Sequence, residues 1–206
     1  MRFKVFPEWF ASKSATFKIV ITAMFTALAT IANAYATIPV GPTLKFSVVL
    51  TIYFFAGILL GAPLGFAVGF IGDLLGWIIF TDGAYNPIIG ISTGLFCFIP
   101  GLVFSVSNMF IKKQGIVSFV IASLISYLLC YALCTVLLTT WGIWLYTSYI
   151  QNKYGTFVAW VGYRALWQLP NAAANYAVSL LVYFVLRKVK YFSGAFYYRP
   201  KEQISE

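Results

Sequence analysis

The chain has 206 residues, of which 61% are hydrophobic, 19% aromatic and only 9% charged, with a formal net charge of +9. Its mean hydropathy is +0.87. Soluble globular domains carry about a quarter charged residues, so this composition excludes an ordinary soluble domain and indicates an integral membrane protein. The length suits about six spans of about 20 residues. We therefore predict one all-α membrane domain over residues 1–206, a bundle of six transmembrane helices.

The positive charges flank the apolar runs and form no separate basic segment. They precede the first span, occupy the loop at Lys112 and Lys113, and follow the last span, so that eleven of the fourteen lie on one side of an even-span bundle. The positive-inside rule then predicts that both termini are cytoplasmic. Because the cations serve the span ends, we expect no nucleic-acid partner.

Three regions are expected in chain order. Residues 1–16 are typical of an amphipathic segment on the cytoplasmic surface. Residues 17–190 form the six-helix core, and residues 191–206 form a cytoplasmic tail. The expected spans are 17–36, 46–60, 64–80, 88–111, 116–138 and 164–186.

Three segments of the core are expected on the outer side. Thr37–Lys45, TIPVGPTLK, predicts an extended loop that could act as a lid, because its prolines and glycine end the first helix. Thr81–Pro87 predicts a turn. The stretch 139–163, rich in Trp, Tyr, Gly and Asn, predicts an interfacial loop or half-helix.

The segment Ile52–Pro87 is nearly all apolar and carries a glycine every three or four residues. Glycines at this spacing share a helical face and let a second backbone approach closely. Asp73 is the one acid clearly inside a span. It is either a proton or cation site or a structural hydrogen-bonding group, and we favour the structural role because no His and no second buried acid accompany it.

Candidate binding residues gather at the outer ends of the expected spans. Arg164, at the predicted start of the sixth span, could clamp a carboxylate with two hydrogen bonds, or it could extend to the lipid headgroups. Lys45, at the outer start of the second span, could serve the same anionic ligand. Aromatic rings and amides at this level could bind a flat ring, although an aromatic belt is the alternative for several of them. The predicted substrate-binding residues are Lys45, Tyr85, Asn86, Trp141, Arg164, Trp167 and Asn171.

Asn171 and Asn175 lie four residues apart and therefore share a face of the last span. Two amides on a helix in lipid need hydrogen-bonding partners, and a ligand cavity would be one source.

Catalytic and metal-binding motifs are absent from the sequence. The chain contains no His and no Walker loop, so it offers neither a nucleophile–base pair nor a route to ATP hydrolysis of its own. Cys97, Cys130 and Cys134 lie in apolar runs and are expected to be free thiols. We expect no enzyme activity, no catalytic residue, no metal and no cofactor.

The sequence resembles the substrate-binding S components of energy-coupling factor (ECF) vitamin transporters, and the folate branch in particular. The resemblance is carried by Ala23-x-x-x-Ala27, by Lys45 before an apolar run, by the turn Gly61–Ala62–Pro63, and by Gly72–Asp73–Leu74–Leu75–Gly76. It covers roughly residues 17–190. It implies six helices, an outward-facing vitamin pocket, and partners that comprise a transmembrane coupling subunit and two ATPases in the bacterial plasma membrane.

The resemblance leads to a specific prediction and leaves alternatives open. Small side chains permit close helix approach, so Ala23 and Ala27 are predicted to dock on the coupling subunit. Folate is the expected ligand. Cobalamin, riboflavin, pantothenate and a queuosine precursor are alternatives, because Asn86–Pro87–Ile88 departs from the folate pattern. A proton-driven carrier using Asp73 and a membrane scaffold are the other hypotheses.

Overall fold

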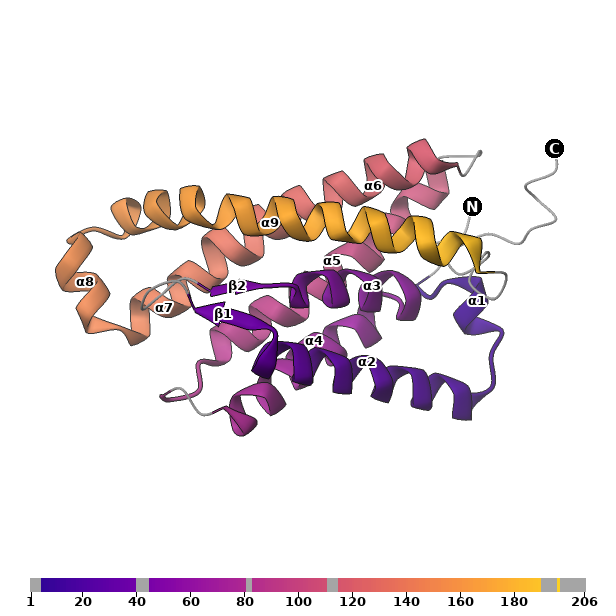
Figure 1. Cartoon of the computed structure of the whole chain (residues 1–206), viewed down its shortest axis with the longest axis horizontal. Helices are drawn as coiled ribbons and strands as arrows, with labels where there is room; N and C mark the ends of the chain where they lie inside the picture. The colour runs from indigo at the N-terminus through magenta and orange to yellow at the C-terminus, as the bar shows by residue number, and fades with distance from the viewer. Residues whose placement is uncertain (1–4, 40–44, 81–82, 111–114, 190–195, 197–206) are drawn as a thin grey trace.

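The computed structural model describes residues 5–39, 45–80, 83–110, 115–189 and 196, and these form a nearly all-helical bundle (Figure 1). Within the described residues, five stretches are long and apolar enough to cross a membrane. By length and composition this agrees with a helical, multi-pass membrane protein, with five such stretches where six spans were predicted. The five stretches are α2 (Ala15–Tyr35), α4 (Ala62–Ile79), α5 (Pro87–Phe110), the run α6 (Ile116–Leu129), η1 (Cys130–Thr139) and α7 (Thr140–Tyr146), and α9 (Phe157–Lys188).

The helix expected as the second span is shorter than a membrane crossing. It is α3 (Val49–Leu60), whose 12 residues extend about 18 Å at 1.5 Å per residue. The predicted start at residue 46 was wrong because β2 (Lys45–Ser47) is a strand, paired antiparallel with β1 (Thr37–Pro39) so that Thr37 faces Ser47. The extended backbone predicted for Thr37–Lys45 is therefore observed at both of its ends, while residues 40–44 lie outside the described residues.

The short helix α3 lies in the centre of the bundle, and ten of its 12 residues are buried. Glycines allow its close contact with α4 and α5. A Cβ on Gly57 would overlap the carbonyl oxygen of Cys97, and a Cβ on Gly101 would lie 2.6 Å from the carbonyl oxygen of Gly57. The prediction that the glycines of Ile52–Pro87 let a second backbone approach is thus confirmed for Gly57.

The first helix packs on α4 by the same principle. A Cβ on Gly72 would lie 2.9 Å from the Cβ of Ala29, and one on Gly76 would lie 2.8 Å from Nδ2 of Asn33. The helix α2 therefore buries one face against α4 and leaves its opposite face, which includes Ala23, exposed.

The second half of the chain is more helical than predicted. The stretch 139–163 contains α7, α8 (Ser148–Tyr154) and the beginning of α9. The last span starts at Phe157 and not at Arg164, because Oγ1 of Thr156 accepts a hydrogen bond from the N–H of Ala159 at 3.4 Å and caps the helix. Arg164 consequently lies about two turns inside α9, and the predicted boundary was wrong.

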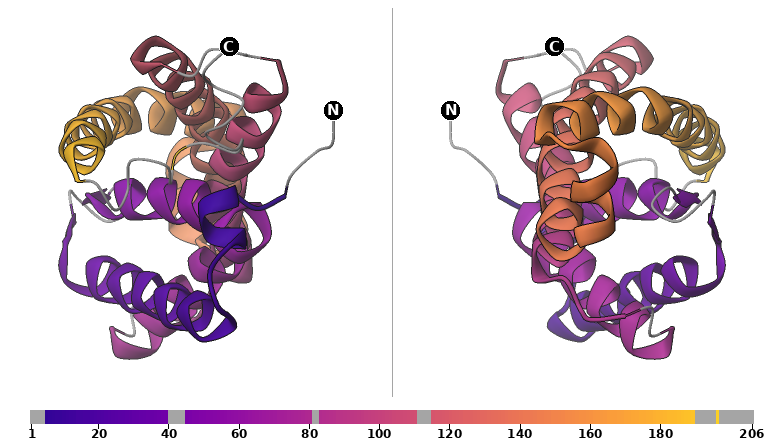
Figure 2. Two further views of the ribbon diagram at one scale, coloured as in Figure 1. Left: turned by 90° about the vertical axis from the view of Figure 1, so that its right-hand side faces the viewer. Right: turned by 90° about the vertical axis from the view of Figure 1, so that its left-hand side faces the viewer.

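The two ends of the bundle differ in structure (Figures 1 and 2). One end carries α1 (Glu8–Ala11) and the last turn of α9. The opposite end, named the hairpin end below, carries β1, β2, α7 and α8. Phe10 of α1 is buried, so the amphipathic segment packs on the bundle. The predicted tail lies outside the described residues except for Phe196, which is also buried.

Candidate ligand-binding site

A stripe of buried polar side chains runs along α9 toward the hairpin end. Its members are spaced three or four residues apart, so they share the helix face that contacts α3, η1 and α7. Each of them is at most 7% exposed, in a helix whose other faces carry exposed Val and Leu side chains. Buried polar groups in a membrane helix either make structural hydrogen bonds or serve a function. The stripe consists of Arg164, Gln168, Asn171, Asn175 and Ser179.

Arg164 is the cationic member of the stripe and is only 3% exposed. Its Nε donates to Oγ1 of Thr140 at 3.2 Å, and its guanidinium lies over the ring of Trp160, 5.5 Å from the centroid. The indole Nε1 of Trp160 donates to the Thr140 carbonyl at 3.3 Å. The side chain of Arg164 thus points from α9 toward α7. Of the two alternatives, an inward orientation and an extension to the lipid headgroups, the structure supports the inward orientation.

Asn171 is bonded to protein groups. Its Oδ1 accepts from the N–H of Ser47 at 3.2 Å and from Nδ2 of Asn175 at 3.2 Å, and its Nδ2 donates to Oε1 of Gln168 at 3.4 Å. The partners expected for the two amides of α9 therefore include the hairpin backbone. Whether Asn171 also touches a ligand stays a prediction.

Tyr85 and Asn86 lie just before α5. Oδ1 of Asn86 accepts from the N–H of Ile88 at 3.1 Å and so caps the start of α5. A Cβ on Gly142 would lie 3.2 Å from Nδ2 of Asn86, which places this amide beside α7. Asn86 lies beside Gly142 and Arg164 bonds to Thr140, so both side chains contact the short helix α7.

The Tyr85 ring packs against Trp77, with centroids 5.4 Å apart. Burial, and to a lesser degree the nearby Asp73 carboxylate, raise the pKa of Tyr85 to about 12. Asp73 itself is 8% exposed and accepts a hydrogen bond from Nδ2 of Asn33 at 3.4 Å. This bond joins α4 to α2 and supports the structural interpretation of Asp73.

The remaining predicted site residues do not join the stripe. Trp141 and Trp167 are 48% and 50% exposed, which fits the aromatic-belt alternative better than a pocket lining. The backbone of Lys45 belongs to β2, and its side chain lies outside what the structure describes. Sequence reasoning missed Thr140 and Ser47, because single hydroxyls beside apolar runs give no signal of the partners that the fold brings to them.

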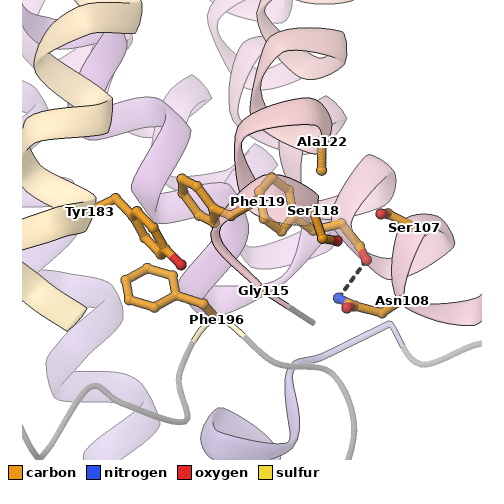
Figure 3. A pocket seen from close by; sticks show the side chains of 9 residues that line it. Ser107, Asn108, Gly115, Ser118, Phe119, Ala122, Tyr183 and Phe196 are labelled. Carbon is orange, nitrogen blue, oxygen red and sulfur yellow. Dashed lines mark hydrogen bonds between the residues drawn. The ribbon is translucent and has the colours of Figure 1, made fainter. Parts of the chain in front are cut away.

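A small cavity lies away from this stripe, where α5 ends and α6 begins (Figure 3). Phe119, Tyr183 and Phe196 gather on one side of it and Asn108 lies on the other. Its volume of about 20 Å³ has room for one water molecule, whereas ligand pockets span roughly 300–1,000 Å³. This cavity is therefore too small for a ligand-binding pocket of ordinary size.

A helical membrane bundle with a buried arginine and amide side chains gathered toward one end has the features of a membrane protein that captures a polar solute. Residues 17–186 match the family of the ECF transporter, substrate-specific component. The chain therefore belongs to this family, whose members work with the membrane and ATPase module of an ECF transporter. No curated protein matches the chain.

Proposed function

We propose that this protein is the folate-capturing subunit of an ATP-driven uptake system in the bacterial plasma membrane. In this proposal the hairpin end faces outward and the α1 end faces the cytoplasm. The chain binds the vitamin, while ATP is hydrolysed by partner subunits and not by the chain itself. Family membership supports the transport role, and the chemistry of the stripe on α9 supports an anionic ligand.

The observation that carries the proposal is the burial of Arg164 near the hairpin end. A buried cation in a membrane protein is costly and is usually kept for a function. The guanidinium forms paired hydrogen bonds with carboxylates and stacks on aromatic rings, and Arg164 already lies over Trp160. Folate carries two carboxylates on its glutamate tail and a flat pterin ring, so it offers a partner for each property.

Other ligands and other modes of transport remain as alternatives that the same site can test. A neutral or much larger vitamin, such as riboflavin or cobalamin, would not depend on Arg164 for a carboxylate. A proton-coupled carrier would require Asp73 to exchange protons. The bond from Asn33 to Asp73 gives that carboxylate a structural role between α2 and α4 and does not favour this hypothesis.

The first prediction compares two cations at the hairpin end. Arg164→Ala should weaken folate binding by about thirty- to several-thousand-fold, because losing one charge-assisted hydrogen bond in a desolvated site costs roughly 2–5 kcal/mol. Lys153→Ala is the matched control. Lys153 is exposed in α8 near the Tyr149 and Tyr154 rings, so its charge acts only through weak, salt-screened attraction.

The measurement is a calorimetric titration of purified wild type and both variants with folate, preceded by a melting curve for each. Failure of the folded wild type to bind folate would remove the vitamin assignment and leave the family assignment intact. Folate binding that is indifferent to Arg164→Ala would keep the vitamin and overturn the position given to its tail.

A further inference from the structure

Two side chains of α9 take the place of a third strand beside the hairpin. On the edge of β2 that faces α9, the N–H of Ser47 donates to Oδ1 of Asn171 at 3.2 Å, and the carbonyl of Ser47 accepts from Nδ2 of Asn175 at 2.7 Å. An adjacent strand would offer the same pair of groups, one acceptor and one donor. The two asparagines therefore bond both backbone groups of Ser47 on the side of β2 that faces away from β1.

Asn175 also holds the first turn of α3. Its Oδ1 accepts from the N–H of Thr51 at 3.2 Å and from Oγ1 of Thr51 at 3.1 Å. The side chain is 2% exposed, and both ends of its amide are bonded. One residue thus ties the last residue of β2 and the start of α3 to the middle of α9.

The bonds from Asn171 and Asn175 to Ser47 satisfy backbone groups that would otherwise lack protein partners. The N–H and carbonyl on the free side of a strand need hydrogen-bonding partners, and the two bonds that α9 makes to Ser47 are partly buried. A buried N–H or carbonyl left without a partner costs more than the bond itself contributes. If the amides of α9 were removed, the Ser47 N–H and carbonyl would have to bond to water instead, and β2 would lose these bonds to α9.

We propose that Asn175, together with Asn171, is the positioning residue of the hairpin. It fixes β1 and β2 beside the stripe that carries Arg164, and it thereby sets how long a bound ligand is retained. The part that concerns the ligand rests on the proposed function above. The part that concerns the hairpin rests only on the hydrogen bonds between β2, α3 and α9.

The test begins without ligand. Hydrogen–deuterium exchange of the peptide that contains Ser47 is measured for wild type, Asn175→Leu and Ser179→Ala in lipid nanodiscs. Ser179 is the matched control because it is buried one turn further along the same face and bonds to the Tyr127 hydroxyl at 2.6 Å, away from the hairpin. We expect Asn175→Leu to raise the exchange rate at Ser47 about tenfold or more, since each lost bond is worth roughly a fivefold change.

Asn171→Leu is the second variant in case Asn175→Leu does not fold. It removes the acceptor of the Ser47 N–H and keeps the bonds between Asn175 and Thr51, and it should raise exchange at Ser47 but not at Thr51. Exchange at Ser47 that matches wild type or Ser179→Ala in both asparagine variants would overturn the proposal, even if their melting temperatures fall.

A measurement of the rate of folate release separates this inference from the vitamin assignment. If wild type binds folate, Asn175→Leu should release it about tenfold faster, whereas Lys153→Ala, an exposed position outside the stripe, should release it at the wild-type rate. Equal release rates would overturn the role in retention. If wild type binds no folate, the vitamin proposal fails, and the exchange measurement still decides whether Asn175 positions the hairpin.

Discussion

At the scale of single residues, many buried or partly buried hydroxyls and amides among the described residues bond to backbone groups. The hydroxyls of Thr22, Thr26 and Thr30 each donate to the carbonyl four residues earlier in α2. The sequence predicted that Arg164 could face inward, because the positive-inside rule disfavours an arginine at the outer end of a span unless it has a function there. It could not predict Thr140 as the partner of Arg164, since that contact depends on how α7 packs on α9.

Tyr85 departs from this pattern and leads to a prediction on alkaline stability. Its hydroxyl is buried near the Asp73 carboxylate and not bonded to a backbone group. The pKa of about 12, raised by burial from its ordinary value of 10, means that the folded state holds the phenol proton more tightly than the unfolded chain. Wild type should therefore lose stability as the pH rises from 10 through 12.

Tyr85→Phe should reduce this alkaline loss, because phenylalanine has no phenol proton to lose. The measurement is the melting temperature between pH 8 and 11.5. Tyr146→Phe, which removes an exposed phenol at the end of α7, is the control for the loss of a phenol elsewhere. A Tyr85→Phe curve parallel to that of wild type above pH 10 would contradict the assignment.

At the scale of elements, the sequence predicted the type of each long helix better than its ends. Apolar runs and glycine spacing were sufficient for α2, α4 and α5. The beginnings of α3 and α9 were missed because each depends on a local device, the strand β2 in one case and the Thr156 cap in the other. The amide contacts between α9 and β2 join residues more than 120 positions apart, and no periodicity in the sequence reports such a pairing.

The glycine contacts between α3 and α5 give a prediction on folding. Gly57→Ala should destabilise the protein severely, because the added methyl would overlap the carbonyl of Cys97 and backbone cannot yield as a flexible side chain can. Gly162→Ala is the control, since nothing lies within 4 Å of its Cβ position in α9. It should be neutral or stabilise by up to about 1 kcal/mol.

Melting curves and the yield of monodisperse protein measure both variants. Gly57→Ala with a wild-type melting temperature would show that α3 and α5 are not packed backbone to backbone. A loss of equal size in Gly162→Ala would show that the effect comes from the glycine substitution in general and not from the contact.

At the scale of the whole molecule, the two halves of the chain pack by different means. Both halves contain packed aromatic rings, but close glycine contacts are prominent from α2 to α5, whereas the half from α6 to α9 contributes Arg164 and the buried amides of α9. The hairpin joins them, because β1 follows α2 and β2 is bonded to α9. The helix α2 lies at the periphery of the bundle (Figure 2).

The exposed face of α2 leads to the last prediction, which concerns assembly. Ala23 and Ala27 are exposed on α2, next to Met24 and Leu28, while Ala29 is buried against α4. Members of this family work with a membrane and ATPase module, and in lipid the close approach that small side chains permit is a main source of helix association. Ala23→Trp should therefore block co-purification with the coupling subunit and leave ligand binding by the isolated protein near the wild-type value.

Val117→Trp, on a lipid-exposed position of α6 that is 70% accessible, adds the same bulk elsewhere and should permit assembly. Co-purification that survives Ala23→Trp, or that is lost equally in Val117→Trp, would show that this face of α2 is not the docking surface.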